Sequence, residues 1–195
     1  MSFDYIFKKG SLDYGIVKGD ERIAFIKTGR GSSCFGENEK YLKMAKSLNS
    51  KYKCSVIVAS NPNDELKNHI AEDTEAINEY ITKAKLTSQK LYLFGNSNGC
   101  IKGLELFESG FSFEKILLVN MPLMINPHRI NRYIKGFNQT EIVAIFGEYD
   151  PSVSYVPFFK NKYKNIKVNI YPRADHNFSN LTDNFIALSD VLFNP

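Results

Sequence analysis

The segment Leu91-Tyr92-Leu93-Phe94-Gly95-Asn96-Ser97-Asn98-Gly99 is an apolar run of β-forming residues followed at once by a glycine-flanked serine. Residues 101–107 are expected to be helical, so the serine falls on a turn between a strand and a helix. A serine on such a turn projects its hydroxyl above the sheet. The positions two before and two after it must be small, because strand and helix approach closely there, and Gly95 and Gly99 meet this need.

Ser97 is therefore a candidate nucleophile. At the start of a helix, backbone N–H groups and the helix dipole favour developing negative charge. The Gly-x-Ser-x-Gly pattern alone is a weak signal because it arises by chance, and its strand–turn–helix context strengthens it. The alternative is an ordinary glycine-rich turn in which Ser97 caps the following helix.

Outward from this segment, strands alternate with helices from residue 22 onward. The predicted strands are 3–8, 14–18, 22–27, 54–59, 91–94, 116–119, 142–146 and 167–171, and the predicted helices include 37–48, 61–84, 101–107 and 177–193. This alternation implies an α/β fold with a mostly parallel sheet of about eight strands and helices on both faces. Residues 1–195 are expected to form one domain, because no Pro-, Gly- or Ser-rich linker divides them.

Ligands bind at the carboxyl ends of the strands in open sheets of this kind, so the residues just after each strand matter most. Ser97, Asp150 and His176 each follow a predicted strand. In this chain order of serine, acid and histidine, the sequence resembles the α/β-hydrolase family over essentially its whole length. The resemblance implies a serine hydrolase with a catalytic triad of these three residues.

The segment from Phe146 to Val153, Phe-Gly-Glu-Tyr-Asp-Pro-Ser-Val, resembles the acid loop of that family. A buried carboxylate at Asp150 would orient the histidine and stabilise its imidazolium. The alternative is an Asp-Pro turn. If Asp150 is not the acid of the triad, Glu148 and Asp175 are the other candidates for that role.

His176 lies in Arg-Ala-Asp-His-Asn-Phe, which resembles the family's histidine loop, and it is the one histidine that follows the last predicted strand. The alternative is a surface histidine near a helix start. His128 precedes the acid in the chain, which does not fit the family order. His69 is off the apolar positions of its helix and is expected to face solvent; those positions are Leu66, Ile70, Ile77, Tyr80, Ile81 and Ala84.

An oxyanion hole needs two backbone N–H donors. One is expected from Asn98, directly after the nucleophile. The other is expected from the loop after the third strand, where many relatives carry His-Gly and this sequence has Thr28-Gly29-Arg30-Gly31. Arg30 is the predicted donor and Gly31 is the second candidate. The alternative for the whole loop is a plain β-to-α turn.

About 20 residues separate the strand ending near Asn120 from the one starting near Ile142, which leaves room for a loop and one helix. We therefore expect no cap domain and an open site. Met121 and Leu123 follow a strand directly and are predicted to bind the acyl group of the substrate. Core packing under the loop is an equal alternative for both.

The resemblance implies hydrolysis of a carboxylic ester or thioester of a small molecule through an acyl-enzyme on Ser97. Amide or peptide hydrolysis with the same triad is an alternative, and so is a non-catalytic small-molecule receptor on the same fold. A doubly wound nucleotide-binding protein is disfavoured, because no G-x-G-x-x-G or P-loop motif follows an early strand. A Cys–His hydrolase using Cys34 is disfavoured because the residue on the strand-to-helix turn, Ser97, is a serine.

Composition excludes several other classes. The 195 residues are 43% hydrophobic and 24% charged, with no apolar run long enough for a membrane span. The N-terminus lacks the features of a signal peptide, so a cytoplasmic location is expected. The cysteines, Cys34, Cys54 and Cys100, show no CxxC spacing and are interpreted as reduced thiols.

No metal, cofactor, nucleic-acid partner or membrane is expected. The histidines are scattered and show no HxxxH or HxH spacing. The densest basic stretch, Lys40 to Lys53, also carries apolar residues at helical spacing and is interpreted as the solvated face of an amphipathic helix. The sequence does not indicate an oligomeric state.

Overall fold

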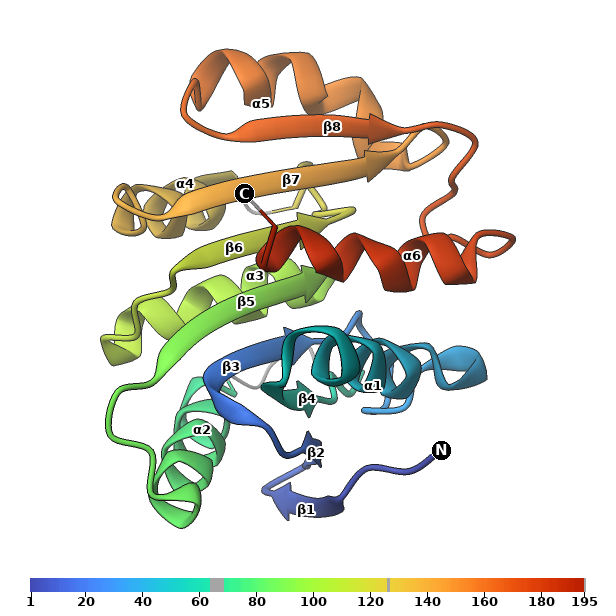
Figure 1. The fold of residues 1–195 in the computed structure, drawn as a ribbon. Helices are drawn as coiled ribbons and strands as arrows, with labels where there is room; N and C mark the ends of the chain where they lie inside the picture. The colour runs from blue at the N-terminus through green and yellow to red at the C-terminus, as the bar shows by residue number, and fades with distance from the viewer. Residues whose placement is uncertain (64–68, 126, 195) are drawn as a thin grey trace.

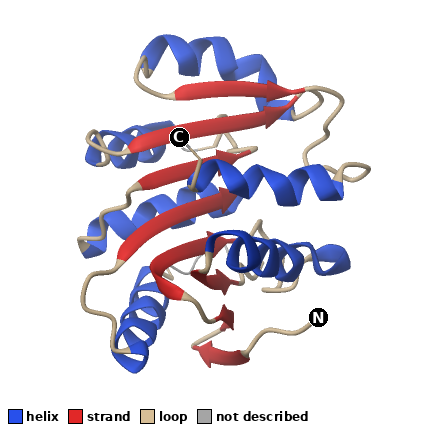
Figure 2. Ribbon diagram, viewed as in Figure 1, coloured by secondary structure: helices blue, strands red, loops and turns tan. Residues whose placement is uncertain are grey.

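The computed structural model describes residues 1–63, 69–125 and 127–194. Within these residues, eight strands form one sheet in the order β1-β2-β4-β3-β5-β6-β7-β8 (Figures 1 and 2). The pairs β1–β2 and β2–β4 are antiparallel and the others are parallel, which confirms the predicted mostly parallel sheet. The strands are β1 Tyr5–Lys9, β2 Leu12–Val17, β3 Asp20–Lys27, β4 Cys54–Ala59, β5 Lys90–Asn96, β6 Lys115–Val119, β7 Glu141–Gly147 and β8 Lys167–Tyr171.

Helices cover both faces of the sheet, as predicted (Figure 1). One face carries α1 (Lys40–Tyr52) and α6 (Thr182–Leu188), and the other carries α2 (Ile70–Ala84), α3 (Asn98–Leu104), α4 (Pro127–Gly136) and α5 (Val156–Lys162). Four short 3₁₀ segments lie among the described residues: η1 Glu37–Glu39, η2 Glu105–Ser109, η3 Pro151–Tyr155 and η4 Ser189–Leu192.

Two apolar layers result, one on each side of the sheet. Side chains alternate along a strand, so each central strand supplies both layers. In β3, for example, Ile23 and Phe25 face the layer under α2 to α5, whereas Ala24 and Ile26 face the layer under α1 and α6. A strand buried on both faces reads as a continuous apolar run, and all six residues of β4 are buried.

Two helix predictions differ from the structure by five residues or more at one end. The predicted helix 177–193 begins only at Thr182, because the Asp175 side chain accepts hydrogen bonds from the backbone N–H groups of Asn177 and Ser179 and holds a loop there. The predicted helix 61–84 begins, among the described residues, at Ile70, and its Leu66 lies outside them. Helix α5 was not predicted.

Among the described residues, the segment between β6 and β7 holds α4 and its flanking loops. The absence of a cap domain is therefore confirmed for this part of the chain. No helix in the described ranges is long and apolar enough to span a membrane.

Candidate active site

Ser97 stands on a sharp turn between β5 and α3. Its backbone has φ 52° and ψ −127°, a conformation that non-glycine residues rarely adopt. The turn is held because the Ser97 N–H donates to the Val119 carbonyl of β6 at 2.8 Å, and the Ser97 carbonyl accepts from the Cys100 N–H at 3.0 Å. Strain of this kind persists only where the surroundings fix it, and it occurs often at functional sites.

The two flanking glycines permit this turn. A Cβ added at Gly99 would lie 2.3 Å from the Thr28 carbonyl oxygen and 2.4 Å from that of Lys27. A Cβ added at Gly95 would lie 2.6 Å from the Cα atom of Cys100. Helix α3 can therefore approach β3 and β5 only because both positions lack a side chain.

Gly99→Ala should destabilise the protein by about 3 kcal/mol, because the added methyl meets backbone atoms that cannot rotate away. Urea unfolding would measure the loss. Gly110→Ala is the control, since a Cβ at Gly110 meets nothing within 4 Å. With φ 78°, that variant bears only backbone strain of about 1–2 kcal/mol. If Gly99→Ala costs no more than the control, the close contact is not what the turn depends on.

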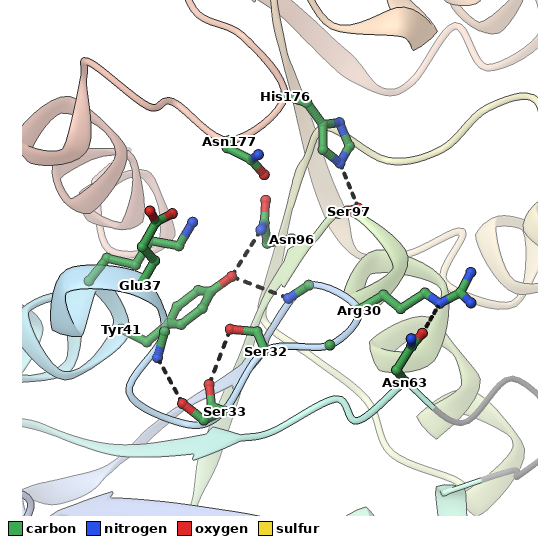
Figure 3. A pocket seen from close by; sticks show the side chains of 14 residues that line it. Arg30, Ser32, Ser33, Glu37, Tyr41, Asn63, Asn96, Ser97, His176 and Asn177 are labelled. Atoms are coloured by element: carbon green, nitrogen blue, oxygen red, sulfur yellow. Dashed lines mark hydrogen bonds between the residues drawn. The ribbon is translucent and has the colours of Figure 1, made fainter.

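Three side chains from separate loops form a hydrogen-bonded chain. Ser97 Oγ lies 2.8 Å from His176 Nε2, and His176 Nδ1 lies 2.5 Å from Asp150 Oδ2. Figure 3 shows the histidine ring directed at Ser97 above the turn. The Asp150 side chain is fully buried, whereas 39% of the His176 side chain is exposed. The hydroxyl and the imidazole are thus open to a ligand, and the carboxylate is shielded from water.

Asp150 is fixed by its own loop. Its second carboxylate oxygen, Oδ1, accepts from the Ser152 N–H at 2.7 Å, so the residue caps η3. Its backbone N–H donates to the Gly147 carbonyl at 3.0 Å. With one oxygen held by the backbone, the other is kept in position for His176.

Asn120, which the sequence analysis did not single out, joins the two loops that carry Asp150 and His176. This fully buried residue follows β6 directly. Its Nδ2 donates to the His176 carbonyl at 2.8 Å, and its Oδ1 accepts from the Gly147 N–H at 2.7 Å. A polar residue immediately after a buried strand is the same signal that marked the triad, so it could have been found.

Glu148 and Asp175, the other candidates for the triad acid, form no hydrogen bond with the His176 ring. Glu148 accepts from the Arg173 N–H at 2.7 Å, and Asp175 holds its own loop through two backbone N–H groups. Adjacent residues in a loop point in different directions. The Asp175 carboxylate accordingly bonds to the backbone of its own loop and not to the ring of the neighbouring His176. Both carboxylates shape the histidine loop.

The two predicted oxyanion donors lie on either side of the turn. Asn98 is the first residue of α3, and Arg30 is in the loop after β3. Gly31, the alternative to Arg30, donates its N–H to the Asn61 carbonyl at 2.7 Å, and Gly29 donates to the Tyr41 hydroxyl at 3.2 Å. Because the N–H groups of Gly29 and Gly31 already donate to these partners, the backbone N–H of Arg30 stays the predicted oxyanion donor of this loop.

Tyr41 ties this loop to the turn. Its hydroxyl accepts from the Gly29 N–H and, at 2.9 Å, from Asn96 Nδ2, one residue before Ser97 (Figure 3). The side chain is fully buried, and burial raises the pKa of Tyr41 to about 12. The phenol thus stays neutral at ordinary pH and can hold both partners.

A cavity of about 790 Å³ opens at Ser97. Its walls are the loop from Gly29 to Ser33, the start of α1, and the His176-Asn177 segment (Figure 3). Met121 and Leu123 are not among its lining residues. Met121 is fully buried in the core under α2 to α5, and Leu123 lines a separate apolar cavity of about 280 Å³ between α4 and α5. Their predicted contact with the acyl group stays a prediction.

No protein-family model matches the chain, and no curated protein matches it by sequence. Solved structures do match it. Est1E from Butyrivibrio proteoclasticus superposes with a TM-score of 0.71 at 13% identity, covering 94% of both chains. Dienelactone hydrolase from Anabaena variabilis gives 0.70 at 16% identity, covering 99% of this chain and 96% of its own. The fluorophosphonate-binding serine hydrolase F of Staphylococcus aureus gives 0.70 at 9%, covering 98% and 97%.

This chain has the α/β-hydrolase fold.

His128 and Cys34, the two other side chains considered for the reaction, take no part in the hydrogen-bonded chain at Ser97. His128 is exposed on α4. Cys34 is buried, and burial raises the pKa of its thiol to about 11, so little nucleophilic thiolate exists near neutral pH.

The prediction that His69 faces solvent is wrong, since only 1% of the residue is exposed. His69 is the cap residue before α2, with φ −101° and ψ 18°. The prediction places His69 inside the helix and takes its exposure from the helical spacing. Because His69 precedes the first helical residue, that spacing does not apply to it.

Proposed function

We propose that this protein is a serine hydrolase that cleaves a carboxylic ester or thioester of a small molecule through an acyl-enzyme on Ser97. The observation that carries the proposal is the chain from Ser97 Oγ through His176 to buried Asp150, built on a strained turn after β5. Dienelactone hydrolase and the S. aureus serine hydrolase share the fold and are hydrolases by name, which supports the same class here.

In the first half-reaction, His176 Nε2 takes the Ser97 proton while Ser97 Oγ attacks the carbonyl carbon of the substrate. The N–H groups of Asn98 and Arg30 stabilise the negative oxygen of the tetrahedral intermediate. The C–O or C–S bond then breaks, and His176 returns the proton to the leaving alcohol or thiol. Asp150 keeps Nδ1 protonated, so that Nε2 can accept.

In the second half-reaction, a water molecule gives a proton to His176 and attacks the acyl-enzyme. The same oxyanion donors act again, and the proton returns to Ser97 Oγ as the carboxylic acid leaves. The partly exposed His176 lets water reach this position without a large movement of the loops. The scheme uses no metal or cofactor. A cytoplasmic location and the lack of nucleic-acid or membrane partners stay predictions.

A chromogenic panel tests the proposal: p-nitrophenyl esters of increasing acyl length, a thioester, and a p-nitroanilide, each with wild type and Ser97→Ala. We expect serine-dependent turnover of the ester or thioester. Turnover of the anilide alone would favour the amide-hydrolase alternative. Binding of these compounds without turnover would favour a receptor on the same fold.

Asn120→Ala should lower stability by about 2–4 kcal/mol, because the Gly147 N–H and the His176 carbonyl lose a buried partner. It should also lower kcat by about 10–100-fold, since the histidine loop loses its anchor. Urea unfolding and ester kinetics measure the two effects. Asn138→Ala, at an exposed site, is the control and should change stability by less than about 0.5 kcal/mol. Parent-like kinetics in a destabilised Asn120→Ala protein would limit Asn120 to a structural role.

A further inference from the structure

The cavity at Ser97 has an unusually polar wall for a site that accepts an acyl group. Most side chains that line it are polar or charged, among them Ser32, Ser33, Asn63 and Asn177. Small-molecule pockets are typically lined mainly by apolar and aromatic side chains. The wall therefore favours a substrate with a hydrophilic group over one with a long acyl chain.

Like Arg30, Lys40 is a cation on this cavity wall that the triad does not use. It is the first residue of α1, half-buried, and lines the same cavity as Ser97 and His176. Its ammonium lies 4.9 Å from the centre of the Phe185 ring and 5.5 Å from that of Tyr41. These rings hold the lysine stem and remove water from one side of the ammonium.

Lys40 forms no ion pair with the described residues. The carboxylates of Glu37 and Asp175 act on it from beyond ion-pair distance, and burial still lowers the pKa of its ammonium. A partly desolvated cation attracts an anion more strongly than a hydrated surface lysine does, because the local dielectric constant is lower. Three features mark Lys40 as a place for anionic oxygen atoms: its position on the cavity wall, the two aromatic rings under its ammonium, and the lack of a direct ion pair to a described residue.

We propose that Lys40 binds an anionic group of the substrate, so that the site prefers esters carrying a carboxylate or phosphate in addition to the scissile bond. This inference rests on the proposed function and names its substrate class. Arg30 is on the same cavity wall, but Figure 3 shows its side chain directed to Asn63, whose Oδ1 accepts from Arg30 Nε at 2.6 Å. The specificity is therefore assigned to Lys40.

The test compares p-nitrophenyl butyrate with the p-nitrophenyl monoester of succinate, whose acyl groups have the same number of carbons. Wild type should show a kcat/KM about tenfold or more higher for the succinate ester, the scale of one charge-assisted hydrogen bond. Lys40→Met should abolish this ratio and leave butyrate hydrolysis within about twofold, because methionine keeps the apolar stem over both rings. Lys40→Arg should retain the preference.

Lys43→Met is the matched control, since Lys43 is exposed on the same helix. It should keep the wild-type ratio. Equal kcat/KM for the two esters in wild type, or an unchanged ratio in Lys40→Met, would overturn the inference. If neither ester is hydrolysed and Ser97 does not react with a fluorophosphonate, the proposed function itself fails; hydrolysis of butyrate without a preference overturns only the role of Lys40.

Inhibition distinguishes the two kinds of anion. Succinate and inorganic phosphate are tested as competitive inhibitors of butyrate hydrolysis, in wild type and in Lys40→Met. Inhibition by succinate alone assigns a carboxylate and inhibition by phosphate alone assigns a phosphate, provided that Lys40→Met weakens it about tenfold. Inhibition that is the same in both proteins would contradict binding at Lys40.

Discussion

Ser97→Ala should lower kcat for ester hydrolysis by about 10⁴–10⁶-fold, because the atom that forms the acyl-enzyme is removed. Binding and the oxyanion donors would remain, which leaves a small residual rate above that in water. The measurement is kcat with the best ester of the panel, on protein free of contaminating esterase activity.

The fold should survive this change. The Ser97 hydroxyl bonds to His176, whereas the turn is held by backbone hydrogen bonds and by the space at Gly95 and Gly99. We expect the free energy of unfolding to stay within about 1 kcal/mol of wild type. Undiminished turnover by the folded variant would end the serine-hydrolase account.

Asp150→Asn should lower kcat by about 10⁴-fold, the scale of this change in a Ser-His-Asp triad. The amide can donate to Nδ1, which favours the tautomer with the proton on Nε2, and that nitrogen then cannot accept from Ser97. The Asn oxygen can still accept from the Ser152 N–H, so the η3 cap and the loop should be kept. Ester kinetics and urea unfolding measure the two effects.

Asp175→Asn is the paired control, one residue from His176 in sequence. The Asp175 side chain holds the backbone N–H groups of Asn177 and Ser179, and an Asn oxygen can do the same. This variant should retain activity within a few-fold of wild type. If Asp175→Asn is the crippling change and Asp150→Asn is mild, the assignment of the acid is wrong.

The parts of the structure that depend on local spacing could be predicted from the sequence. The strand–Gly-x-Ser-x-Gly–helix segment fixes a sharp turn, because only glycine fits at Gly95 and Gly99. The continuous apolar run of β4 indicates a strand buried on both faces, and the structure has it at the predicted residues 54–59. Local spacing of this kind is why the predicted sheet, its mostly parallel pairing and the helices on both faces are confirmed by the structure.

Side chains that meet across the fold could not be predicted from local spacing, and the set Ser97, Asp150 and His176 is expected only through the family resemblance. Tyr41 lies in the stretch Lys40 to Lys53, whose spacing predicts only an amphipathic helix, yet its hydroxyl joins Gly29 to Asn96, more than 50 residues along the chain. The burial of His69 was predicted wrongly because its backbone lies outside the helical repeat. The sequence pattern predicts a solvated helix face at Lys40, whereas α6 brings Phe185 under its ammonium.

The central claim is that Ser97 is a nucleophile activated by His176 and Asp150. Its most direct test is reaction with a fluorophosphonate, followed by mass spectrometry of the peptide that contains Ser97. We expect one phosphonyl adduct per chain on Ser97, no adduct in Ser97→Ala, and much slower labelling in Asp150→Asn. An unmodified Ser97 in folded wild-type protein, or equal labelling of wild type and Ser97→Ala, would contradict the account.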